Sequence, residues 1–235
     1  MKKIIICSAF LFFTLTGNAE EHQSYLIISP DESRSIVEVP QAMKDLGEER
    51  KNQIKNRGYI SEYSEFAVTL SAFKDKKGTN ESMIESDPYF KILRLNTLDF
   101  SLSFPFNGFP SVGEKNLLGF VPSGSYLGDT KEWTGVTAFF TTNSLVCRLT
   151  IFDMPAMNGQ SVYDSNHTTF NINKKPTWTS ASGTPESGFL YEASWTGKRY
   201  EKMLECANQK PFNPRGIKDV VTLAKKIDKD LPDEP

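Results

Sequence analysis

The chain has 235 residues, of which 27 are lysine or arginine and 29 are aspartate or glutamate, giving a net charge of −2 at pH 7. A chain of this length can bury one sizeable hydrophobic core or two small ones. The slight acidic excess argues against nucleic acid or an anionic membrane as the main partner, because both require a basic surface.

Residues 1–19 have the three parts of a cleavable export signal. Lys2 and Lys3 provide a positive start, residues 4–15 form an apolar run, and residues 17–19 provide small side chains before a cleavage site. The apolar run is shorter than the roughly 20 residues that a membrane-spanning helix needs, so we expect cleavage rather than membrane anchoring. The paired lysines are typical of bacterial signals, which predicts a periplasmic protein with no stable membrane insertion of the mature chain.

Residues 20–60 are predicted to form an N-terminal extension. Two short β-prone runs, residues 25–29 and 35–39, flank a turn-forming segment and predict a hairpin. Residues 41–57 are rich in helix-forming residues and end at Gly58, which predicts a helix with a natural stop. This helix has a narrow apolar stripe, so we expect it to be mostly solvated.

Residues 61–231 are predicted to form one α+β sandwich domain. Alternating apolar residues predict strands over residues 66–73 and 98–106, which are separated by a polar loop at residues 74–88. The last residues, 232–235, are predicted to be a disordered tail.

The most distinct hairpin is predicted over residues 189–195 and 198–207, joined by a two-residue turn at residues 196–197. This register pairs Trp195 with Lys198. Its alternation gathers a set of apolar residues on one face: Phe189, Tyr191, Ala193, Trp195, Tyr200, Leu204 and Cys206. Charged residues fall on the opposite face: Glu192, Arg199, Glu201 and Glu205.

An amphipathic helix follows the hairpin. Asn213 is a suitable N-cap and Pro214 a suitable first helical residue, after which apolar residues recur at three- and four-residue spacing over residues 217–227. Its apolar stripe is expected to cover the apolar face of the sheet. The predicted fold class is therefore α+β: an antiparallel sheet covered on one face by a C-terminal amphipathic helix, as a single domain with a small N-terminal hairpin and helix extension.

Two cysteines remain after Cys7 leaves with the export signal. Cys147 and Cys206 each lie on the apolar face of a predicted strand, so their side chains point toward the same interior. Two cysteines in an exported chain most simply form a disulfide. Two free thiols or a metal-binding pair are the alternatives, although neither a C-x-x-C motif nor neighbouring histidines accompany these residues.

Recognisable catalytic motifs are absent from the sequence. His22 lies beside the predicted mature N-terminus and His167 in a polar loop, and neither has a second histidine at a metal-binding spacing. No nucleophile elbow or phosphate-binding glycine loop occurs. We therefore predict no catalytic residues, no metal site, no cofactor and no enzymatic activity.

Residues 104–133 are rich in glycine, proline and aromatic residues. The segment could present aromatic side chains to a partner, because aromatic residues often anchor interfaces. The candidate partner-binding residues are Phe106, Phe109, Phe120, Tyr126 and Trp133. The alternative, which we favour, is a long connection whose aromatic residues pack back into the core.

These features predict a non-enzymatic exported protein that acts by contact with another protein. The most specific hypothesis is an immunity or inhibitor protein that neutralises a secreted toxin or effector acting in the periplasm. One alternative is a carrier with a small molecule or lipid between the sheet and the C-terminal helix. Another is an enzyme with an unrecognised site, which would place His167 in a cleft.

Overall fold

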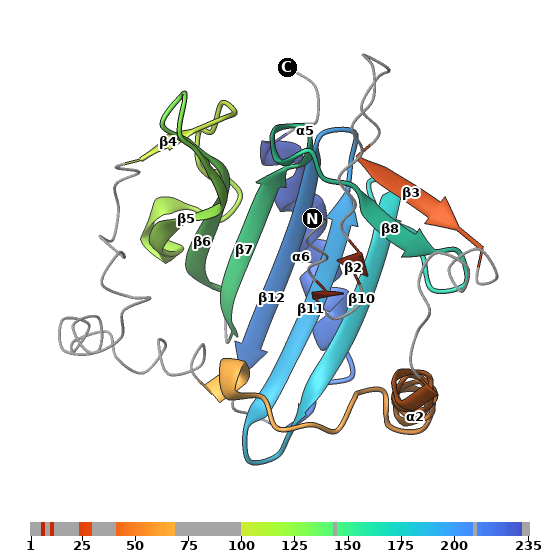
Figure 1. Ribbon diagram of the computed structural model, residues 1–235. Helices are drawn as coiled ribbons and strands as arrows, with labels where there is room; N and C mark the ends of the chain where they lie inside the picture. The colour runs from red at the N-terminus through yellow and green to blue at the C-terminus, as the bar shows by residue number, and fades with distance from the viewer. Residues whose placement is uncertain are drawn as a thin grey trace.

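The alternating apolar segments of the second half of the chain form one sheet (Figure 1). The computed structural model describes residues 6–7, 10–11, 24–29, 41–68, 100–142, 145–208 and 211–231. Neighbouring strands follow the order β4-β6-β7-β12-β11-β10-β9, and β5 pairs with β6. The strands are β4 (Ser101–Leu102), β5 (Leu117–Leu127), β6 (Glu132–Thr142), β7 (Leu145–Asp153), β9 (Thr169–Ile172), β10 (Lys175–Thr184), β11 (Gly188–Thr196) and β12 (Tyr200–Asn208). All pairs are antiparallel except β4 with β6.

Helix α6 (Gly216–Asp230) packs across one face of this sheet (Figure 1). Its apolar stripe places Val220, Ala224 and Ile227 in the core, together with the apolar residues of β11 and β12. Neither α6 nor any other helix in the described parts of the chain is long and apolar enough to cross a membrane. The predicted α+β fold, an antiparallel sheet covered on one face by a C-terminal amphipathic helix, is confirmed.

The helix begins later than predicted. Pro214 precedes the helix, and Gly216 is its first residue. The carbonyl oxygen of Asn213 accepts the N–H of Gly216 at 2.9 Å, and the Asn213 side-chain oxygen accepts the N–H of Arg215 at 3.0 Å. Gly216 lies so close to Tyr191 that an added Cβ atom would be 2.2 Å from the ring. A glycine at this position lets the helix start against the sheet.

Strands β11 and β12 form the predicted hairpin, but the predicted register is wrong. Gly197 donates its N–H to the carbonyl of Tyr200 at 3.0 Å, so the turn falls at residues 198–199 rather than 196–197. The residue of β12 that faces a given residue of β11 therefore lies four positions later than predicted, so that Trp195 pairs with Lys202 rather than with Lys198. An even displacement leaves every side chain on its predicted face, and the apolar residues predicted to share a face all lie in the core.

A tertiary contact accounts for the position of this turn. Asp153, buried at the end of β7, accepts hydrogen bonds from Arg199 Nη2 at 2.7 Å and Arg199 Nε at 3.1 Å. Its other partner is Ser103 Oγ, which donates at 2.9 Å and joins the segment after β4 to the same cluster. Local turn propensity contains no information about this ion pair. A single helical turn, α5 (Met154–Met157), follows directly after Asp153.

Cys147 and Cys206 form a disulfide between β7 and β12. The two residues are direct cross-strand partners with Cα atoms 4.1 Å apart, and both are buried in the core. The predicted bridge is confirmed, and the alternatives of free thiols or a metal-binding pair are wrong. A buried disulfide is typical of proteins that fold outside the reducing cytosol.

The N-terminal extension contributes a helix with the predicted bounds. Helix α2 (Gln41–Arg57) lies to the side of the sheet, with Leu46 and Ile54 exposed (Figure 1). After α2 the chain joins the sheet, because the N–H of Ile60 donates to the carbonyl of Ala181 at 2.8 Å. The boundary between the extension and the main domain at residues 60–61 stays a prediction.

Strand β3 (Tyr25–Ile28) pairs in parallel with β8 (Ser161–Asp164). Its predicted hairpin partner, residues 35–39, lies outside the described residues. Strands β1 (Ile6–Cys7) and β2 (Phe10–Leu11) form an antiparallel pair. Three further parts of the chain lie outside the described residues: the rest of the predicted export signal, His22, and the predicted tail at residues 232–235.

Residues 65–68 form a helical turn where alternation predicts a strand over residues 66–73. Ser64 begins this turn, because its hydroxyl accepts the N–H of Ala67 at 3.0 Å in the manner of an N-cap. The turn packs against the face of the sheet opposite α6. The strand prediction is wrong for residues 66–68, and residues 69–88, including the predicted polar loop, lie outside the described residues.

Candidate functional site

The candidate partner-binding residues separate into two groups in space. The first group packs at the end of the core: the ring centroid of Phe106 lies 5.0 Å from that of Phe109 and 5.7 Å from that of Phe120. Phe109 and Phe120 are buried, and Phe106 is partly buried against the core. These three residues pack against the core, as the core-packed interpretation predicts. Phe109 and Phe120 also line the hollow described below.

The second group is a pair on β5 and β6. Tyr126 and Trp133 are direct cross-strand partners whose ring centroids lie 5.3 Å apart. Tyr126 is 53% exposed, and Trp133 is partly buried beside it. The five aromatic residues therefore do not form one continuous surface, and their role in partner binding stays a prediction.

Much of the Gly- and Pro-rich segment is the edge strand β5 rather than a loop. Pro122 cannot donate a hydrogen bond, which an edge strand tolerates. The register shifts between Leu117 and Gly119 and again between Ser123 and Tyr126. Such bulges and prolines are common on edge strands because they prevent pairing with other chains. The glycine- and proline-rich composition predicts a long connection, but residues 117–127 form an irregular edge strand instead.

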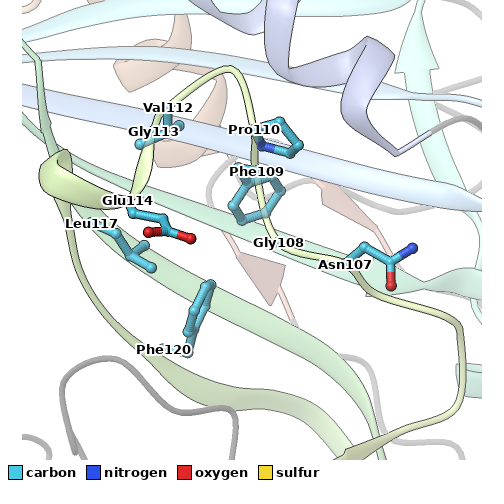
Figure 2. A pocket seen from close by; sticks show the side chains of 9 residues that line it. All are labelled: Asn107, Gly108, Phe109, Pro110, Val112, Gly113, Glu114, Leu117 and Phe120. Atoms are coloured by element: carbon cyan, nitrogen blue, oxygen red, sulfur yellow. The ribbon is translucent and has the colours of Figure 1, made fainter.

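A surface hollow of about 660 Å³ lies between the loop that follows β4 and the start of β5 (Figure 2). The hollow is lined by Asn107, Gly108, Phe109, Pro110, Val112, Gly113, Glu114, Leu117 and Phe120. All of these residues lie within the segment at residues 104–133 that the sequence singled out. The hollow itself was not predicted.

Local hydrogen bonds shape the loop that forms this hollow. Val112 donates its N–H to the carbonyl of Phe109 at 3.0 Å, which closes one turn. The 3-10 turn η1 (Glu114–Asn116) follows, and Asn116 Nδ2 donates back to the carbonyl of Val112 at 2.7 Å. Gly113 has a φ of 77°, a backbone conformation that glycine adopts readily. Any residue with a side chain would be strained at this position.

The same loop is attached to the end of α6. The N–H of Ser111 donates to Asp230 Oδ2 at 2.9 Å, and its hydroxyl donates to Asp230 Oδ1 at 2.8 Å. Two hydrogen bonds to one carboxylate fix both the position and the orientation of the loop. The hollow is therefore preformed in the unbound protein.

The walls of the hollow combine aromatic rings with one acidic group. Figure 2 shows the rings of Phe109 and Phe120 on either side of a space into which the Glu114 carboxylate points. Glu114 is exposed and is the only charged residue among the described residues of the lining. Within the described parts of the chain, its carboxylate forms no ion pair or hydrogen bond.

Other candidate sites lie elsewhere. His167 is exposed in the turn after β8, where its Nδ1 lies 3.3 Å from Asp164 Oδ2. The space between α6 and the sheet, where a carrier would hold its ligand, is filled by buried side chains of both elements. The described residues contain no group of three or more His, Cys, Asp or Glu side chains that could hold a metal ion.

The face of the sheet opposite α6 carries a transverse row of polar side chains. Ser180, Glu192, Glu205 and Arg148 are successive cross-strand partners on β10, β11, β12 and β7. Arg148 forms a bidentate ion pair with Glu205, with Nη2 2.9 Å from Oε1. Glu192 accepts a hydrogen bond from Ser180, and Arg148 acts on it through charge at longer range.

Two carboxyl groups on this face have strongly raised pKa values. Burial raises the pKa of Glu192 to about 7, and the nearby Glu205 carboxylate adds to the effect. Burial likewise raises the pKa of Glu201 to about 7, although Ser161 donates a hydrogen bond to it. Both groups are therefore largely protonated in mildly acidic solution.

We expect the free energy of unfolding to fall as the pH rises from about 4.5 to 7. The folded-state pKa of each glutamate lies above its ordinary 4.5, so its stabilising contribution is complete below pH 4.5 and is lost as the pH rises through 7. Glu192→Gln and Glu201→Gln should each reduce this fall by on the order of 1–3 kcal/mol, measured by urea unfolding across the pH range. Glu186→Gln, in an exposed turn, is the matched control, and an unchanged pH profile in both test variants would contradict the assignment.

No protein-family model matches this chain, and no curated protein or solved structure matches it either. The fold and the hollow define a class: a disulfide-bonded α+β protein with a preformed surface hollow.

Proposed function

We propose that this is an exported, non-enzymatic protein that acts by contact with another protein, and that its partner binds at the hollow. The observation that carries the proposal is the arrangement of the hollow: buried Phe109 and Phe120 at its centre, and exposed Asn107, Pro110 and Glu114 around them. Protein interfaces commonly have an aromatic centre surrounded by a polar rim. The fixed loop lowers the entropic cost of binding, because little ordering is needed.

The proposed location of the protein is the periplasm, reached through cleavage of residues 1–19. The buried Cys147–Cys206 disulfide supports an oxidising compartment. Within this class, we propose an immunity or inhibitor protein that neutralises a secreted toxin or effector acting in the periplasm. The acidic excess of the chain, 29 acidic against 27 basic residues, is compatible with such a blocker.

The test is capture of the partner from periplasmic extract with the full chain, followed by mass spectrometry. Leu117→Trp places a larger side chain in the hollow and should abolish capture of the partner. Phe170→Ser, on β9 at the other edge of the sheet, removes an exposed aromatic residue and should leave capture unchanged. Circular dichroism checks that both variants fold.

The immunity hypothesis has its own measurement. Co-expression with the captured protein should restore growth of cells that this protein otherwise kills, and Leu117→Trp should abolish the rescue. Recovery of no specific protein by the wild-type chain would contradict a contact function. A partner that harms no cell would contradict the immunity role while leaving the contact function intact.

A further inference from the structure

The hollow combines features that, in proteins, recognise organic cations. Among the described residues that line it, the only charged one is Glu114, whose carboxylate points into the space between the rings of Phe109 and Phe120 (Figure 2). The faces of aromatic rings attract cations through their quadrupole. A carboxylate beside two rings therefore favours a positively charged group over a neutral or anionic one.

We propose that the hollow binds a lysine or arginine side chain that the partner protein presents. This inference rests on the proposed function and names the chemistry of the contact. The cationic head group lies against the Glu114 carboxylate and the two phenylalanine rings. Its aliphatic stem lies along the apolar surface of Leu117 and Val112, as long basic side chains commonly do.

Two features of the site support this assignment. Within the described residues, the Glu114 carboxylate has no intramolecular cation, and no lysine or arginine lines the hollow. The hollow is also held open in advance, because Ser111 is fixed to Asp230 and Asn116 is fixed to Val112. A volume of about 660 Å³ readily admits one long side chain.

The first test uses small probes on the full chain. N-acetyl-arginine amide and N-acetyl-lysine amide should shift the NMR signals of Phe109 and Phe120, whereas uncharged N-acetyl-citrulline amide should not. Glu114→Gln keeps the shape of the side chain and removes its charge, so it should weaken binding of the cationic probes by about tenfold or more. Glu186→Gln, which removes an exposed carboxylate elsewhere, should leave binding unchanged.

The second test uses the captured partner. Its affinity should fall by about tenfold with Glu114→Gln and should decrease with salt in the wild-type protein more steeply than in this variant. Equal binding of the citrulline and arginine probes, or equal binding of the cationic probes by Glu114→Gln, would overturn the inference. If Leu117→Trp loses the partner and Glu114→Gln retains it, the proposed function stands and the cation assignment fails. If the probes bind but no protein does, the hollow is a small-molecule cation site and both proposals fail.

Discussion

Reduction of the Cys147–Cys206 disulfide is expected to lower the free energy of unfolding by about 4 kcal/mol. The bridge joins residues separated by 59 positions, and restriction of a loop of this length in the unfolded chain accounts for that magnitude. For a chain of this size the corresponding fall in Tm is about 10 °C. Urea unfolding with and without dithiothreitol measures the effect, and a non-reducing mass two hydrogens below that of the reduced chain verifies the bridge.

The control for reduction is the double variant Cys147→Ala/Cys206→Ala. Its stability should be independent of dithiothreitol, because it has no bridge to reduce. Each single variant leaves one thiol in the core and should resemble the reduced protein. Equal stability of the oxidised and reduced wild-type chain would show that the bridge does not stabilise the fold.

Asp228→Asn is expected to destabilise the protein by about 3–5 kcal/mol, because it leaves a buried cation without its counter-ion. Lys202 on β12 is 0% exposed, and its Nζ lies 2.8 Å from Asp228 Oδ1 on α6. Lys175 Nζ also lies 2.8 Å from this oxygen, and Trp195 Nε1 donates to it at 2.7 Å. Asn173 Nδ2 donates to Oδ2 at 2.8 Å. One carboxylate thus joins α6 to the three strands β10, β11 and β12 and to the turn between β9 and β10.

Two further variants separate the effect of the lost charge on stability from the effect of lost packing. Adding Lys202→Met to Asp228→Asn removes the unpaired cation and should recover part of the lost stability. Lys175→Ala should destabilise less, by about 1 kcal/mol, because the Lys175 side chain is 17% exposed whereas that of Lys202 is fully buried. A loss for Asp228→Asn no greater than that for Lys175→Ala would contradict the role of the buried pair.

The contacts of Asp228 also predict that the free energy of unfolding depends on pH in the acidic range. Burial alone would raise the pKa of this carboxyl, but the Lys202 charge and the hydrogen bonds from Lys175 and Asn173 lower it from an ordinary 3.8 to about 2. The folded-state pKa lies below the unfolded one, so the contribution is complete above about pH 4 and is lost as the pH falls through 2. Urea unfolding should therefore show the wild-type advantage over Asp228→Asn shrinking between pH 4 and 2.

Side-chain alternation predicts the buried faces of β7 and β12 correctly but fails at residues 66–68, which lie in a helical turn. It places Cys147 and Cys206 on one buried face, although the predicted turn before β12 lies two residues before the observed one. The error did no harm to the assignment of faces, because a displacement by an even number of residues preserves alternation. The correct register depends on Arg199 and Asp153, whose contact joins two separate segments of the chain.

The buried ion pair was missed although the sequence contained a signal for it. Alternation puts Lys202 on the same face as Leu204 and Cys206, where an ammonium group requires a carboxylate partner. Asp228 lies one helical turn after Ala224, on the apolar side of the predicted helix. A lysine and an aspartate on two facing apolar surfaces are therefore a sequence signal for a buried ion pair.

The hollow could be located only in part. Glycine, proline and aromatic residues at 104–133 indicated an unusual segment, and the structure places every lining residue within it. The shape of the hollow depends on the contact of Ser111 with Asp230, which are separated by 119 positions. A contact between such distant residues has no local signature, so Glu114 was not distinguished from the other acidic residues of the chain.

The irregular edge at β5 limits how any partner can bind near the hollow. Pro122 lacks an amide hydrogen, and the two bulges interrupt the regular spacing of backbone groups along this strand. A peptide that extends a sheet needs an uninterrupted row of donors and acceptors. Recognition on this side of the molecule is therefore expected to use side chains that insert into the surface rather than strand addition, which makes specificity a matter of side-chain shape and charge.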